Sequence, residues 1–144
     1  MSEDLHALLY VSTAEVPFTS TDLVELTSTS SYANESRQIT GYLWFDGSMF
    51  LQYLEGPSNE VDQLEARIRD DERHTIVKMF RRSIPAAERR FEGWSMRLMN
   101  ANERFEMHME GVLVALLEIP QGSDEPRARS AWALTDRLSA MRSA

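Results

Sequence analysis

The sequence contains no cysteine, which excludes disulfide bonds, thiolate metal sites and a cysteine nucleophile. Basic residues are also scarce, because 15 Lys and Arg stand against 23 Asp and Glu, for a formal net charge of −8. Nucleic-acid backbones and anionic membranes both bind basic surfaces. We therefore expect neither a nucleic acid nor a membrane as a partner of this chain.

Long apolar segments are absent as well. The longest mostly apolar run, residues 111–120, has about half of the ~18 residues that a membrane-spanning helix needs. The N-terminus opens with acidic residues rather than with the basic residues and apolar core of a secretory signal. We expect a cytoplasmic protein with one hydrophobic core, for which 144 residues and 42% hydrophobic content are sufficient.

Familiar catalytic motifs are missing too. The sequence has no Gly-rich phosphate loop, no G-x-S-x-G elbow and no H-E-x-x-H motif. His6, His74 and His108 are too far apart in the sequence for a familiar metal-ligand spacing. No carboxylate pair stands on a predicted core face, so the sequence contains no positive sign of an enzyme.

Alternating apolar and polar residues predict five β-strands. The strands are expected at residues 5–12, at both ends of residues 39–56, and at residues 75–84 and 94–99. Asp46-Gly47 separates the second strand from the third and is the strongest hairpin signal in the chain.

Two helices are predicted between these strands. Thr19 and Asp22 form a capping-box pattern before the first helix, and Val61, Leu64 and Ile68 are spaced to face the core from the second. The residues spaced to face inward from the first helix are Leu23, Leu26, Ser30 and Ala33. The order β-α-β-β-α-β with one added strand predicts a ferredoxin-like α+β fold, with a mainly antiparallel sheet and both helices on one face.

The pattern becomes helical again from about residue 101. Two further helices are expected, on either side of the breaker at residues 121–126. The second carries a stripe formed by Ala128, Ala131, Leu134, Leu138 and Met141. We expect these helices to cover the remaining sheet face, and a dimer or partner surface is the alternative role of the stripe.

Gln52 interrupts an otherwise apolar strand face, because it stands between Phe50 and Leu54. Burial of an unpaired amide costs about 1–3 kcal/mol, so Gln52 needs a partner. In the predicted fold, Tyr10 on the neighbouring strand and Asn34 on the first helix can converge with Gln52. A phenol and two carboxamides suit a flat heterocycle with carbonyl and ring-nitrogen positions, whereas a static polar network is the alternative.

These residues resemble those of the BLUF family, the blue-light sensors using flavin. The resemblance covers about residues 5–100, where the family's segments follow in order. The matching segments are LLYVS (8–12), Asn34 ahead of RQITGYLWFDG (37–47), MFLQYLEGP (49–57), DERHTIV (71–77) and FEGWSM (91–96).

The resemblance implies a noncovalently bound flavin, FAD or FMN, between the two helices. Tyr10 would then donate an electron and a proton to the photoexcited flavin. Gln52 would lie between this phenol and the flavin N5/O4 edge, and Asn34 would bond the O4/N3 edge. A rearrangement of the Gln52 hydrogen bonds would shift the absorption slightly to the red.

The resemblance also implies further positions in two groups. Those expected to support or bind the flavin are Ser12, Ser30, Arg37, Asp71, Arg73 and His74. Trp94 and Met96 would relay the state of Gln52 to the surface, and ordinary packing is the alternative for this pair.

We expect residues 1–100 to form the photosensor core and residues 101–144 a C-terminal helical cap or output segment. About 40 residues are too few for an enzymatic effector domain. Output is therefore expected to pass through an unidentified protein partner or a change of assembly, in a homo-oligomer of two or more copies. The main alternative is a ferredoxin-like ligand-binding or protein-interaction module without photochemistry, and a small acyl- or phospho-hydrolase on this fold is a weaker one.

Overall fold

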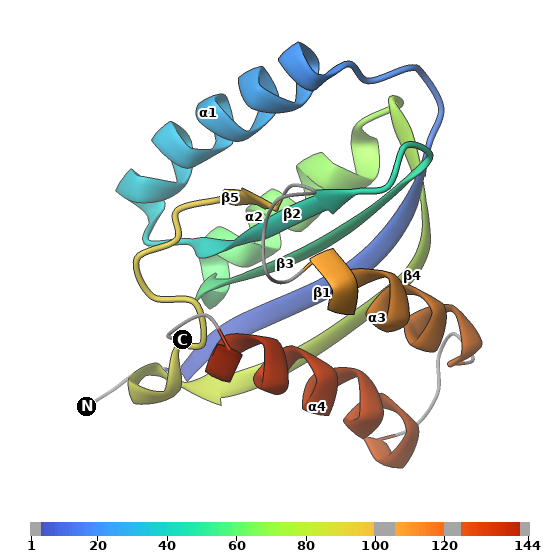
Figure 1. The fold of residues 1–144 in the computed structure, drawn as a ribbon. Helices are drawn as coiled ribbons and strands as arrows, with labels where there is room; N and C mark the ends of the chain where they lie inside the picture. Colours follow the sequence, from blue (N-terminus) through green and yellow to red (C-terminus); the bar gives the residue numbers. More distant parts are fainter. Residues whose placement is uncertain (1–3, 100–105, 120–124, 142–144) are drawn as a thin grey trace.

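The computed structural model describes residues 4–99, 106–119 and 125–141 (Figure 1). Its elements are β1 (Asp4–Ala14), α1 (Ser20–Arg37), β2 (Thr40–Phe45), β3 (Met49–Pro57), α2 (Ser58–Asp70), β4 (His74–Pro85), the short 3-10 helix η1 (Ala86–Glu88), β5 (Arg97–Met99), α3 (Glu106–Glu118) and α4 (Glu125–Met141). No helix within these described residues is long and apolar enough to cross a membrane.

The strands form one five-stranded sheet in the order β4-β1-β3-β2-β5. The β1–β3, β1–β4 and β2–β3 pairs are antiparallel, and β5 runs parallel to β2. The predicted ferredoxin-like α+β arrangement is confirmed, with β1 and β3 as central neighbours.

The fifth strand is shorter than predicted, because residues 94–96 lie outside β5. The backbone N–H of Trp94 donates to the Phe91 carbonyl at 3.1 Å, and the Trp94 carbonyl accepts from the Gly41 N–H at 2.7 Å. These bonds turn the chain at Trp94 before it joins the sheet edge at Arg97. Trp94 and Met96 are therefore not a pair on one strand.

The turn signals of the sequence are confirmed at both predicted sites. Thr19 caps α1 in a capping box with Asp22. Between β2 and β3, the Asp46 carboxylate accepts from the backbone N–H groups of Ser48 and Met49 at 2.9 and 2.7 Å. Gly47 takes a φ of +110°, a conformation that favours glycine.

The inward face of α1 differs from the prediction. Its buried residues are Thr27 and Asn34, whereas the four residues with helical spacing are only half-buried. Leu23 and Leu26 still contact the apolar cluster on this side of the sheet. The difference arises because α1 contacts β2 and β5 along one edge and faces a cavity beside them.

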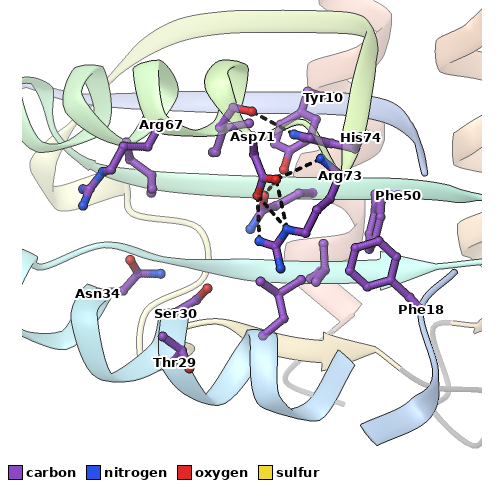
Figure 2. Close-up of a pocket in the computed structure, with 15 residues that line it drawn as sticks. Tyr10, Phe18, Thr29, Ser30, Asn34, Phe50, Arg67, Asp71, Arg73 and His74 are labelled. Carbon is purple, nitrogen blue, oxygen red and sulfur yellow. Dashed lines mark hydrogen bonds and ion pairs between the residues drawn. The ribbon is translucent and has the colours of Figure 1, made fainter. Parts of the chain in front are cut away.

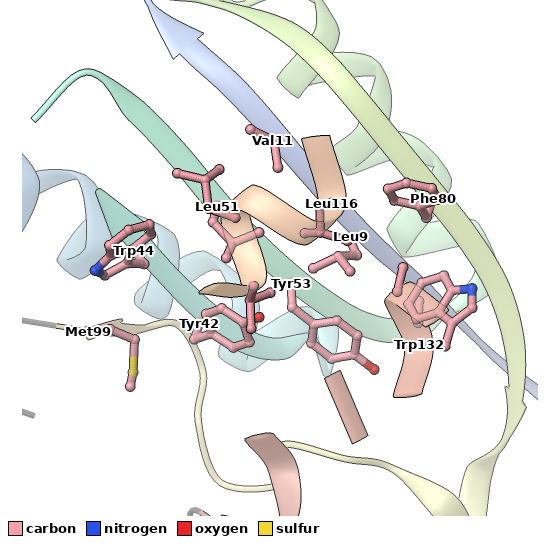
Figure 3. Close-up of a cluster of buried hydrophobic side chains, with 14 of the residues drawn as sticks. Leu9, Val11, Tyr42, Trp44, Leu51, Tyr53, Phe80, Met99, Leu116 and Trp132 are labelled. Carbon is pink, nitrogen blue, oxygen red and sulfur yellow. The ribbon is translucent and has the colours of Figure 1, made fainter. Parts of the chain in front are cut away.

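Each face of the sheet carries its own apolar core. On one face, Leu8, Phe50 and Leu54 pack with the α2 residues Val61, Leu64 and Ile68. On the opposite face, α3 and α4 cover a cluster that includes Leu9, Val11, Tyr42, Trp44, Leu51, Tyr53, Phe80, Leu116 and Trp132 (Figure 3). Of the predicted α4 stripe, Ala131 is buried in this cluster. The side chains of Ala128, Leu134, Leu138 and Met141, like that of His108, lie outside the described part of the structure.

Candidate functional site

A cavity of about 290 Å³ lies between the sheet and the helices α1 and α2, near the lower end of the range for small-molecule sites. Its apolar wall is formed by Phe18, Leu26, Leu43, Phe50, Leu64 and Ile68. Its polar and charged lining residues are Tyr10, Thr29, Ser30, Asn34, Gln52, Arg67, Asp71, Arg73 and His74. Figure 2 shows Phe18 and Phe50 at one end of the cavity and Asn34 and Arg67 at the other.

The Gln52 side chain is hydrogen-bonded at both its oxygen and its nitrogen. Tyr10 stands directly opposite Gln52 in the β1–β3 pairing, and its hydroxyl donates to Gln52 Oε1. The Gln52 amide nitrogen donates to the Met96 sulfur at 3.2 Å. A primary amide offers two N–H donors and two acceptor lone pairs. Within the described residues, these two bonds use one N–H donor and one acceptor lone pair. Gln52 therefore keeps one donor and one acceptor for a molecule in the cavity.

Asn34 reaches the cavity from α1 and is tied to the segment that precedes β5. Its side-chain nitrogen donates to the Ser95 carbonyl at 3.0 Å, and the hydroxyls of Ser31 and Ser95 are hydrogen-bonded. Only 3% of Asn34 is exposed, so this bond is shielded from water. The predicted convergence of Tyr10, Asn34 and Gln52 on one cavity is what the structure shows.

An ion pair lies along the cavity wall opposite α1. Arg73 Nη2 lies 2.7 Å from Asp71 Oδ2, and Arg73 Nε lies 2.9 Å from Asp71 Oδ1. Hydrogen bonds from Arg73 lower the pKa of Asp71 to about 2, and Asp71 raises the pKa of Arg73 in return. This carboxylate is therefore charged at neutral pH.

Burial keeps the Tyr10 phenol protonated. Desolvation raises the pKa of Tyr10 far above its usual value, and the nearby Asp71 charge raises it further. Tyr10 thus enters any reaction in the cavity as a neutral phenol that carries its proton.

His74 connects the cavity to β1 and α2. Its Nε2 lies 2.8 Å from the Ile68 carbonyl, and its Nδ1 lies 2.7 Å from Ser12 Oγ. Because a carbonyl oxygen only accepts, Nε2 carries a proton, and in a neutral ring Nδ1 accepts from the Ser12 hydroxyl. The His74 ring lies edge-on to Tyr10, with 6.0 Å between ring centroids. Ser12 is fully buried behind His74 rather than in the cavity wall.

Two other predicted positions lie away from the cavity. Arg37, at the end of α1, is 3.8 Å from Glu60 in an ion pair and does not line the cavity. Trp94 packs toward the opposite face of the sheet, with its ring centroid 5.4 Å from that of Phe91 and 4.9 Å from the Arg97 guanidinium carbon. Met96, by contrast, is buried on the cavity side.

Sequence reasoning missed several residues of the site. Thr29 and Arg67 line the cavity although both are exposed helix residues, for which periodicity contains no signal. Ser95 is the partner of Asn34, and its place between Trp94 and Met96 in the WSM motif was the one available indication.

Residues 5–97 match the BLUF family, described as sensors of blue-light using FAD. The chain is 41% identical over 73 residues to the photoactivated adenylate cyclase subunit beta of Euglena gracilis, an alignment that covers 51% of this chain and 8% of that protein. It is 38% identical over 77 residues to the blue light- and temperature-regulated antirepressor BluF of Escherichia coli K12, which covers 53% of this chain and 19% of the relative.

Two solved structures share the fold over nearly the whole described chain. BlrB, a BLUF protein in its dark state, is 29% identical with a TM-score of 0.71. The match covers 98% of this chain and 99% of that one. The structure titled BlrP1 BLUF is 30% identical with a TM-score of 0.63, and 97% of this chain covers 90% of that one. Both contrast with the curated relatives above, of whose length this chain spans less than a fifth.

Proposed function

This chain belongs to the BLUF family of blue-light sensors using FAD, and we propose that Tyr10, Gln52 and Asn34 are the residues with which it senses light. It is a flavin-binding photoreceptor by family, and FAD is the flavin that the family uses. The roles of the individual residues in the paragraphs below are our proposal.

The cavity has the chemistry that a flavin ring requires. Six apolar side chains line it and would contact the ring, while Gln52, which keeps one donor and one acceptor, also lines the cavity. On the α1 side, Asn34 and Ser30 would bind the carbonyl and ring-nitrogen edge. Asp71, Arg73 and His74 would close the site from the α2 side, since all three line the cavity there.

Two predicted binding residues take indirect roles in this proposal. Ser12 would act through His74, whose ring it holds at 2.7 Å. Arg37 lies at the end of α1, where it pairs with Glu60. It would therefore act only on a part of the flavin that extends beyond the cavity.

When bound, the flavin supplies a ring that absorbs blue light and, once excited, accepts an electron and a proton. The phenol of Tyr10 is the donor, because it is buried, neutral and hydrogen-bonded to Gln52 Oε1. The Tyr10 phenol becomes acidic as the electron leaves. The hydrogen bond to Gln52 Oε1 is the route along which its proton moves.

Gln52 then changes its hydrogen bonds without changing its charge. An amide can rotate or tautomerise while it stays neutral, which a carboxylate or an ammonium group cannot do. The chain of bonds from Tyr10 through Gln52 to Met96 is the observation that carries this proposal.

The test is the absorption spectrum of the purified protein in the dark and under blue light. We expect a yellow protein whose absorption shifts reversibly to the red, and a Gln52→Leu variant that keeps flavin but loses the shift. Tyr53→Phe, on the same strand but the opposite face, is the matched control and should shift as the wild type does. A colourless protein, or a Gln52→Leu variant with the wild-type shift, contradicts the proposal.

We further propose that the light signal leaves through a protein partner or a change of assembly rather than through catalysis by this chain. The family match ends at residue 97, and the described residues beyond β5 form two helices that pack on the sheet face opposite the cavity. This supports a photosensor core at residues 1–100 and an output segment at 101–144. Light scattering in the dark and under light tests assembly, and a monomer in both states leaves a partner as the route.

A further inference from the structure

Glu55 is a buried carboxylate that the proposed photoreaction does not use. It lies on β3 with 0% of its surface exposed. Like Tyr53, it points to the sheet face opposite the cavity, because side chains alternate along the strand and Gln52 points into the cavity. A buried carboxylate is costly unless hydrogen bonds satisfy both of its oxygens.

Both oxygens of Glu55 are satisfied by donors. Oε1 accepts from the Tyr53 hydroxyl and from the backbone N–H of Arg90, each at 2.8 Å. Oε2 accepts from the Thr40 hydroxyl at 2.9 Å and from the backbone N–H of Phe91 at 2.6 Å. Tyr53 belongs to β3 itself and Thr40 to the neighbouring β2, while Arg90 and Phe91 belong to the segment between η1 and β5. Glu55 therefore binds that segment through its main chain.

This segment continues directly to the cavity wall. The Phe91 carbonyl accepts from the Trp94 N–H at 3.1 Å, and the Trp94 carbonyl accepts from Gly41 at 2.7 Å. The next two residues, 95–96, hold the Ser95 carbonyl that binds Asn34 and the sulfur that binds Gln52. The place of these two acceptors thus depends on how residues 90–94 are held.

We propose that Glu55 is a positioning residue of the photoreaction: by holding residues 90–91 it places residues 95–96 against Asn34 and Gln52. The inference rests on the proposed light-sensing role of Gln52. Glu55 acts across the sheet, from the face that the flavin does not touch.

A carboxylate is required at this position because all four partners donate. In Glu55→Gln the amide is the same size, but one oxygen is replaced by an NH₂ group. Whichever way the amide turns, its NH₂ faces the backbone N–H of either Arg90 or Phe91. One anchor of the segment is lost in both orientations.

Two measurements on Glu55→Gln test the proposal. Hydrogen exchange of residues 89–96 in the dark should be about tenfold faster than in the wild type, while β1 and β3 keep their protection. The rate of dark recovery should change by about tenfold, because the Gln52 partner is no longer held in place. If Glu55 has only a structural role, Glu55→Gln lowers the melting temperature and speeds exchange but leaves the dark-recovery rate as in the wild type, which contradicts the positioning role.

Tyr53→Phe is the matched control, since it removes one Glu55 partner within β3 and leaves both backbone amides bound. It should stay within about twofold of the wild type in both readouts. If Glu55→Gln does not fold, Thr40→Val decides. It removes the hydroxyl that binds Glu55 and accepts from Arg89 Nη1 at 2.9 Å, and we expect a change of about threefold.

Wild-type exchange and recovery in Glu55→Gln, or in Thr40→Val where the first variant does not fold, overturns the proposal. Failure of the proposed function is a separate result. A wild-type protein without a light-induced shift contradicts the light-sensing role, and hydrogen exchange still shows whether Glu55 holds residues 89–96.

Discussion

The side-chain nitrogen of Gln52 lies 3.2 Å from the sulfur of Met96 and donates a hydrogen bond to it. A thioether sulfur is a weak acceptor, whereas the oxygen of Gln52 holds a strong donor in Tyr10. The two ends of the amide are therefore bonded unequally. The bond to Met96 is the one that a rearrangement of Gln52 can give up at little cost.

Met96→Leu should change the photocycle more than the stability. Leucine keeps the volume and removes the acceptor, so we expect a loss of about 1 kcal/mol in the free energy of unfolding. The dark-recovery rate should change by about threefold or more, because one N–H of Gln52 loses its partner. Met99→Leu, on β5 but in the opposite core, is the control. Equal recovery rates in the two variants contradict this role of Met96.

Sequence periodicity was sufficient for the parts of the site that lie on regular elements. Tyr10 and Gln52 stand on alternating strands whose faces are set by their apolar neighbours, so one polar residue on such a face is visible. The hairpin at Asp46-Gly47 also follows from local turn chemistry. These features depend on residues close together in the chain.

The parts that failed depend on contacts between distant segments. Residues 94–99 alternate like a strand, yet the backbone of Trp94 is hydrogen-bonded to Phe91 and Gly41. Periodicity does not predict these backbone bonds. The role of Glu55 is hidden in the same way. Its carboxylate sits in an apolar strand pattern, and its backbone partners at residues 90–91 are donors that every sequence has.

Thr19→Ala should destabilise α1 and weaken flavin binding. Loss of the side-chain cap costs about 1 kcal/mol, since the Asp22 N–H loses its acceptor. Flavin affinity should fall as well, because α1 presents Ser30 and Asn34 to the cavity. Urea unfolding and flavin titration measure the two effects. Thr21→Ala, an exposed position in the same turn, is the control, and equal losses in both variants contradict the capping role.

The Asp71–Arg73 pair should contribute stability that is lost in acid. The pKa of Asp71 is about 2 in the folded chain and about 3.9 in an unfolded one, so the unfolded state binds the proton first. The contribution is complete above about pH 4 and disappears as the pH falls toward 2. Urea unfolding between pH 5 and pH 2.5, buffer values chosen to span about this window, measures it. Asp71→Asn should show a shallower pH dependence, and an unchanged slope contradicts the assignment.

Gly41→Ala should unfold the sheet edge that positions the Trp94–Met96 segment. A Cβ at Gly41 would lie 1.9 Å from the Tyr53 carbonyl oxygen and 2.9 Å from the Leu54 Cα, both backbone atoms that cannot turn away. The β2–β3 pairing must therefore open, and the bond from Gly41 to the Trp94 carbonyl is lost with it. We expect a loss of about 3 kcal/mol or more in the free energy of unfolding.

Gly111→Ala is the matched control for this substitution. Gly111 is exposed on α3, and among the described residues no atom outside its own helix turn lies within 4 Å of an added Cβ. Alanine in a helix interior is favoured over glycine by about 0.5–1 kcal/mol, so this variant should be slightly more stable than the wild type. Thermal unfolding measures both variants. If the close approach at Gly41 is real, the melting temperature falls in Gly41→Ala and rises in Gly111→Ala, relative to the wild type. A Gly41→Ala protein as stable as the wild type would contradict the β2–β3 register, and with it the position of Met96 beside Gln52.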